Sequence, residues 1–189
     1  MQKTMEKRTV ERKKARGLAN VQNLILLGVL LAAGAVLKLV LTSYFTVMKP
    51  NFVIAMYCLA ILLIRPTLLE GAIVGILAGV MCQFFPGLPY INLASELVGA
   101  IAMVLLMRLP LQIRSLDLRP VACTVLATLC SGFTYVGVMY AMFYAGASIV
   151  PTPLAVFMGI IFGTAALNAV IVQVLYVPLR AALKGRIAA

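Results

Sequence analysis

The sequence predicts an all-α membrane protein with six transmembrane helices. Apolar residues make up 63% of the 189 positions and charged residues only 11%, whereas a soluble domain is about half apolar and about a quarter charged. Six apolar stretches follow one another, and basic residues concentrate at every second gap between them. This alternation is typical of a polytopic helical bundle whose basic loops remain on one side of the bilayer.

The positions of Lys and Arg predict that both ends of the chain are cytoplasmic. Seven of the sixteen basic residues lie in the first sixteen positions, and seven more lie at alternate gaps or after the last stretch. Lys38 and Lys49 fall on the opposite side. We therefore expect residues 1–19 to be a basic cytoplasmic tail and residues 20–189 to form the six-helix domain. The net charge of +11 is explained by contact with anionic lipid, so no nucleic-acid partner is predicted.

Prolines, glycines and charges set the limits of the six expected helices. Their ranges are 21–41, 51–64, 68–85, 93–109, 120–144 and 153–184. The second helix is short, because fourteen residues rise about 21 Å against a hydrocarbon core of about 30 Å. Pro178 is expected to kink or end the last helix.

Polar side chains toward the outer ends of these helices form the candidate binding site. Polar groups are costly in lipid, so their positions indicate function. The set comprises Lys38, Lys49, Asn51, Gln83, Tyr90, Asn92, Glu96, Tyr140, Tyr144 and Asn168. Its charges suit the carboxylate and amine of a small zwitterion, and aromatic rings suit an apolar part. The alternatives are lysines that snorkel to headgroups, tyrosines in an interfacial belt, and Glu96 as a partner of the helix dipole.

Small residues recur with four-residue spacing on three of the expected helices. The stripes are Gly28 and Ala32 extended by Ala35, then Gly71, Gly75 and Gly79, and finally Gly159 and Gly163. Such stripes let helices approach closely in lipid, either within one chain or between subunits. Both alternatives stay open, and the stripe of Gly28, Ala32 and Ala35 is the one that best suits docking on another membrane subunit.

The residue inventory argues against an enzyme and predicts no cofactor and no metal site. The chain has no histidine, no P-loop motif and only five carboxylates. Cys58, Cys82, Cys123 and Cys130 lie inside apolar stretches and form no CxxC pair. We expect these cysteines to be small buried hydrophobic residues.

The length, the six spans, the short second helix, the small residues of the first helix and the polar outer end together resemble a known class. That class is the S components, which are the substrate-binding subunits of energy-coupling factor (ECF) transporters. The resemblance covers the chain from about Asn20 onward. Within the class, the segments Met48-Lys49-Pro50-Asn51, Phe85-Pro86-Gly87 and Pro89-Tyr90-Ile91-Asn92 look like the tryptophan-transporter subfamily.

The resemblance implies a function and a set of partners. The chain would bind tryptophan, a vitamin or another aromatic compound in a pocket open to the outside of the bacterial cytoplasmic membrane. It would dock on a transmembrane T component through Gly28, Ala32 and Ala35, and two cytoplasmic ATPases would drive uptake. Two alternatives stay open: a self-contained secondary transporter or channel, and a structural membrane protein that binds partner helices.

Overall fold

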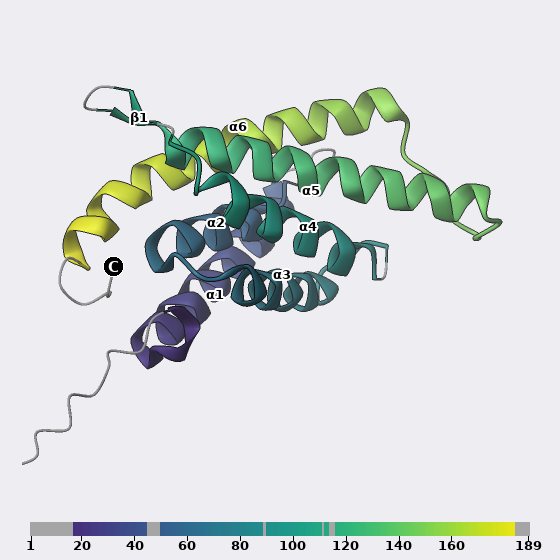
Figure 1. The fold of residues 1–189 in the computed structure, drawn as a ribbon. Helices are drawn as coiled ribbons and strands as arrows, with labels where there is room; N and C mark the ends of the chain where they lie inside the picture. The colour runs from purple at the N-terminus through teal and green to yellow at the C-terminus, as the bar shows by residue number, and fades with distance from the viewer. Residues whose placement is uncertain (1–16, 45–49, 89, 111, 114–115, 184–189) are drawn as a thin grey trace, which may run out of the picture.

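The computed structural model describes residues 17–44, 50–88, 90–110, 112–113 and 116–183, and within these residues it is a bundle of six α-helices (Figure 1). The helices are α1 (Val21–Tyr44), α2 (Phe52–Ile64), α3 (Leu68–Gln83), α4 (Ile91–Leu106), α5 (Arg119–Tyr144) and α6 (Leu154–Ala182). A short 3-10 helix, η1 (Gly17–Ala19), precedes α1. The predicted all-helical fold is confirmed.

Several element limits differ from the sequence expectation. Helix α3 ends at Gln83, two residues early, because the residue before Pro86 disfavours helical backbone. Helix α4 begins at Ile91, two residues early, and α6 continues through Pro178. A small antiparallel hairpin, β1 (Gln112–Ile113) and β2 (Leu116–Asp117), occupies the segment that we expected to be an irregular loop.

Helix length divides the bundle into two groups. Among the described residues, three segments are long and apolar enough to cross a membrane, namely Val21–Leu41, Arg119–Tyr144 and Leu154–Ala182. Helices α2, α3 and α4 are apolar but have only 13, 16 and 16 residues. The long helices support a membrane protein, and the short ones occupy its interior and one flank.

Helix α2 is the centre of the core. Every residue of α2 except Leu63 is buried, and α2 contacts each of the other five α-helices (Figure 1). A helix that is apolar on all sides is stable only when it is enclosed in this way. Since its neighbours cover it, α2 contributes to the core without having to span the bilayer itself.

The glycine stripe of α3 packs within the bundle. A Cβ atom on Gly75 would lie 2.7 Å from the Leu97 Cα and 2.8 Å from the Glu96 carbonyl oxygen. A Cβ on Gly79 would lie 2.8 Å from the Leu93 Cα. Helices α3 and α4 therefore meet backbone to backbone, and this stripe serves the monomer.

Cys130 differs from the other cysteines. Cys58, Cys82 and Cys123 are buried as expected, whereas Cys130 is exposed on α5. The expectation that all four are buried is therefore wrong for Cys130. The physical reason is helical phase, because Ala127, Thr128 and Ser131 turn inward and leave Cys130 on the outer face of the same helix. An apolar thiol tolerates an outward position in a helix of this kind.

Candidate binding site

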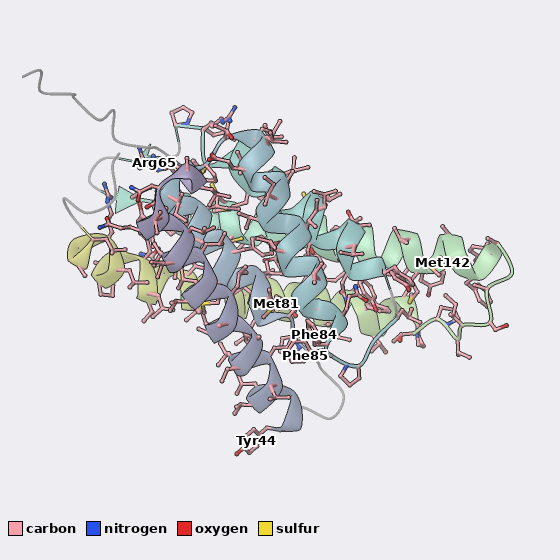
Figure 2. The ribbon with its side chains drawn as sticks, turned by 90° about the horizontal axis from the view of Figure 1, so that it is seen from below. Tyr44, Arg65, Met81, Phe84, Phe85 and Met142 are labelled. Atoms are coloured by element: carbon pink, nitrogen blue, oxygen red, sulfur yellow. The ribbon has the colours of Figure 1, made fainter. Side chains whose placement is uncertain are left out.

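A cavity of about 560 Å³ opens between the carboxyl end of α1 and the amino ends of α2 and α4. Residues from α1, α2, α4, α5, α6 and the α3–α4 loop line it. Figure 2 shows the start of that loop, Phe84 and Phe85, at the opposite end of the bundle from Arg65. The volume lies within the range of about 300 to 1,000 Å³ that is usual for small-molecule sites.

Glu96 places a carboxylate in the cavity wall. Its side chain is 1% exposed, and Asn51 Nδ2 donates a hydrogen bond of 2.5 Å to Glu96 Oε1. Among the described residues, Glu96 Oε2 makes no hydrogen bond of ordinary geometry, although the hydroxyls of Tyr57 and Ser131 interact with the carboxylate. Because α4 begins at Ile91, Glu96 lies in the second turn and not in the first, so a role as partner of the helix dipole is disfavoured. An unmade hydrogen bond on a buried carboxylate is costly, so this oxygen is suited to a ligand donor.

Lys38 brings the opposite charge to the same cavity. Its ammonium lies 3.4 Å from Cys82 Sγ and 4.9 Å from the centroid of the Phe85 ring, and it attracts the Glu96 carboxylate. The side chain lines the cavity. The geometry therefore provides a cation and an anion within one small-molecule-sized space.

Asn168 is not part of the cavity wall, but it contacts residues that are. It is fully buried, and its Nδ2 donates to the Asn51 carbonyl oxygen at 3.3 Å and to Thr128 Oγ1 at 3.4 Å. These bonds link α6 to the start of α2 and to α5. Because the Asn51 side chain in turn contacts Glu96, Asn168 helps to position the carboxylate.

Helices α5 and α6 supply a wall that the sequence analysis missed. Its apolar part contains Tyr135 and Phe157, whose ring centroids are 5.9 Å apart, with Ile160 and Ile161 beside them. Its polar part is Thr128, Ser131 and Thr164, all of them nearly fully buried. The usable signal was helical spacing, since Thr128, Ser131 and Tyr135 recur at positions i, i+3 and i+7 of one apolar helix.

The other residues predicted for the site lie at different places relative to the cavity. Asn92 lines the cavity. Gln83 Oε1 accepts a hydrogen bond of 3.2 Å from the Tyr90 backbone amide, and the Tyr140 hydroxyl donates one of 3.1 Å to the carbonyl of the cavity residue Thr152. The side chains of Tyr90 and Tyr144 are 74% and 80% exposed and lie outside the cavity wall, while Lys49 falls outside the described residues.

The small-residue stripe of α1 is turned away from the bundle. Gly28 and Ala32 are exposed, Ala35 is half-buried, and a Cβ on Gly28 would meet no atom within 4 Å. The close approach of α1 to α2 uses Gly34 instead, where a Cβ would lie 3.1 Å from the Val53 Cα. The face of Gly28, Ala32 and Ala35 is thus not used for packing among the described residues.

A helical bundle with a part-polar, small-molecule-sized cavity at one end can hold a small solute. The chain belongs to the tryptophan transporter family TrpP, whose family model matches residues 20–184. This is a family of ECF S components, so the resemblance drawn from the sequence is confirmed. No curated protein and no solved structure matches the chain.

Proposed function

We propose that the chain is the substrate-binding subunit of an ATP-driven ECF importer and that it binds tryptophan in the cavity. The observation that carries this proposal is the pairing of Lys38 with a buried, half-partnered Glu96 beside an aromatic wall. An amino acid has a carboxylate and an ammonium on one carbon, so it needs one site of each sign. The TrpP family supports tryptophan as the particular ligand.

Each part of tryptophan has a group that suits it. The Lys38 ammonium suits the ligand carboxylate, and Glu96 Oε2 suits the ligand ammonium. Charge-assisted hydrogen bonds of this kind are about twice as strong as neutral ones. Phe85, Tyr135 and Phe157 suit the indole ring, which prefers offset or edge-on aromatic contacts.

We propose that all six helices cross or enter the membrane, with residues 1–19 and both ends of the chain cytoplasmic and the cavity facing outward. The described arginines support this orientation, since Arg65, Arg108, Arg119 and Arg180 lie at helix ends remote from the cavity. The α3–α4 loop would cover the ligand. This orientation corresponds to a bacterial cytoplasmic membrane protein.

We propose further that the loaded subunit docks on a T component through Gly28, Ala32 and Ala35, and that two cytoplasmic ATPases drive release inside. The outward exposure of these small residues on an apolar helix supports the docking face. Small residues favour close helix contacts in lipid, where packing drives association.

Calorimetric titration and thermal unfolding of the detergent-purified full chain test the binding proposal. Tryptophan at 100 times its dissociation constant would add about 2.7 kcal/mol to the unfolding free energy. Asn92→Ala should weaken tryptophan binding, since Asn92 lines the cavity, while Asn20→Ala at the far end should not. Absence of saturable binding by tryptophan would contradict the proposal. Coupling is tested separately, by ATP-dependent uptake with and without the T component.

A further inference from the structure

We propose that the Thr164 hydroxyl accepts a hydrogen bond from a ring N–H of the ligand, and that it thereby selects indole-type ligands over aromatic ligands without such a donor. The inference depends on the proposed function, because it assigns a role within the same cavity. It adds a specificity-determining residue from α6, a helix that carries neither Lys38 nor Glu96.

The first observation is an unpartnered oxygen. Among the described residues, only two side chains that line the cavity have a buried oxygen without a hydrogen-bond partner, namely Glu96 and Thr164. Thr164 is 5% exposed. A threonine in a helix commonly donates to the carbonyl four residues earlier, yet the Thr164 hydroxyl makes no such bond to Ile160. Thr128, which also lines the cavity, already accepts a hydrogen bond from Asn168.

The second observation is the place of Thr164 within the wall. Thr164 follows Phe157, Ile160 and Ile161 by seven, four and three residues, so all four share one face of α6, and all four line the cavity. The hydroxyl is therefore the one polar group on an otherwise apolar stretch of this helix face. The Thr164 hydroxyl is therefore suited to bind a polar atom that belongs to an otherwise apolar ring of the ligand.

The third observation is that the two unpartnered oxygens belong to different walls. Helix α4, which carries Glu96, packs on α3 and α5, whereas α6 packs on α5 and α2. A ligand whose ammonium meets Glu96 places its ring against α5 and α6. An ammonium carries three N–H donors, so a bond to Glu96 does not by itself use all of them. With the ring placed against α6, we assign the donor for Thr164 to the ring N–H, and a ligand that keeps the ammonium but lacks the ring N–H separates the two arrangements.

The chemical consequence is that the cavity disfavours ligands whose ring cannot donate a hydrogen bond to Thr164. An indole ring carries one N–H donor, whereas a phenyl or benzothiophene ring carries none. A ligand that leaves the buried Thr164 oxygen unpaired loses the bond while it still displaces any solvent from that place. Such a loss corresponds to about a tenfold weaker affinity for a neutral pair, and sites of this type are known to discriminate more strongly still.

The test compares tryptophan with benzothienylalanine, in which sulfur replaces the ring N–H at nearly the same size. Calorimetric titration of the full chain in detergent gives both affinities for the wild type, Thr164→Val and Thr164→Ser. Thr134→Val is the matched control, because the Thr134 hydroxyl donates to the Cys130 carbonyl at 2.7 Å and does not line the cavity. Thr164→Cys, a weaker acceptor of similar size, is the second variant at the site.

We expect the wild type, Thr164→Ser and Thr134→Val to prefer tryptophan by about tenfold, and Thr164→Val to bind both ligands with similar affinity. Thr164→Cys should show an intermediate preference, which keeps the inference testable if the valine variant does not fold. Equal affinities in the wild type, or an undiminished preference in the Thr164 variants, would overturn the inference while tryptophan binding still stands. Failure of tryptophan to bind the wild type would instead overturn the proposed function and, with it, this role of Thr164.

Discussion

The two ends of the bundle each hold a glutamate, and the two carboxylates differ in their hydrogen bonding. At the Arg65 end, Glu70 accepts hydrogen bonds from the Thr67 backbone amide at 2.7 Å, from the Thr67 hydroxyl at 3.0 Å and from the Leu18 backbone amide at 2.7 Å. At the cavity end, Glu96 accepts one bond of ordinary geometry, from Asn51, and its Oε2 makes none among the described residues, although the Tyr57 and Ser131 hydroxyls interact with the carboxylate. Figure 2 shows Arg65 and Phe85 at opposite ends of the bundle.

The difference separates a structural carboxylate from one that is suited to a ligand. Glu70 completes a capping box with Thr67 at the start of α3 and holds η1 in place, so its bonds stabilise the folded chain. Glu96 is buried with its hydrogen-bonding capacity only partly used, which lowers stability and leaves a strong acceptor in the cavity. Burial and partner number, and not residue type, distinguish the two.

The largest expected effect comes from Glu96→Gln. The amide has nearly the same size but loses the charge, so the bond to a ligand ammonium becomes a neutral one. We expect tryptophan affinity to fall roughly tenfold to a hundredfold, in line with about 1.5 to 3 kcal/mol for a charged hydrogen bond. Calorimetric titration measures the affinity, and Glu70→Gln is the matched control. Equal losses in both variants would contradict the contrast between the two carboxylates.

Gly75→Ala should destabilise the fold by about 1 to 3 kcal/mol, because the added methyl group meets backbone atoms of Leu97 and Glu96. Helix α4 has to shift, and Glu96 shifts with it, so tryptophan affinity should fall as well. Thermal unfolding without and with tryptophan measures both changes. Gly28→Ala is the matched control, since nothing lies within 4 Å of its Cβ position. An unchanged unfolding temperature for Gly75→Ala would disprove the tight α3–α4 contact.

Glu70→Ala should lower the unfolding free energy by about 1 kcal/mol, because the capping box and the bond to Leu18 are both lost. Tryptophan affinity should not change, since Glu70 does not line the cavity. Thermal unfolding and calorimetric titration of the same preparation provide the comparison. A large loss of affinity would mean that the two ends of the bundle are coupled.

The smallest expected effect concerns Asp117 and acid. Arg119 Nε and Nη2 each donate a hydrogen bond of 2.8 Å to Asp117, and these bonds lower the pKa of its carboxyl below the ordinary value. A lowered pKa contributes stability above the unfolded-state value of about 3.9, and this stability is lost as the pH falls through the folded-state pKa. For a partly exposed pair at the end of the bundle the contribution is below about 1 kcal/mol. Unfolding curves of the wild type and Asp117→Asn, measured at pH 7 and pH 3, test this assignment. The difference in stability between the two proteins should be smaller at pH 3 than at pH 7. A larger difference at pH 3 would contradict the assignment.

Part of the site could be predicted from the sequence because polar residues in apolar helices are conspicuous. Lys38, Asn51, Asn92 and Glu96 were all expected in the site, and they do line one cavity. Tyr90 and Tyr144 carry the same kind of signal but point outward, because a phenol at a helix end is also stable in an exposed position. Thr128, Ser131 and Thr164 were missed. A single hydroxyl in an apolar helix costs little free energy, and its position in the sequence does not reveal which neighbour it faces.

The sequence by itself determined the class of fold, the number and approximate limits of the helices, and the family. Composition and apolar runs are sums over local properties, so they do not depend on how helices pack. Only the tertiary structure decided which glycine stripe is internal, that Lys38 faces inward and that Glu96 retains an unpartnered oxygen. The stripes of α1 and α3 have the same spacing, and they differ only because α4 covers one of them. Contacts between residues far apart in the chain set burial and hydrogen-bond partners, and no local pattern encodes those contacts.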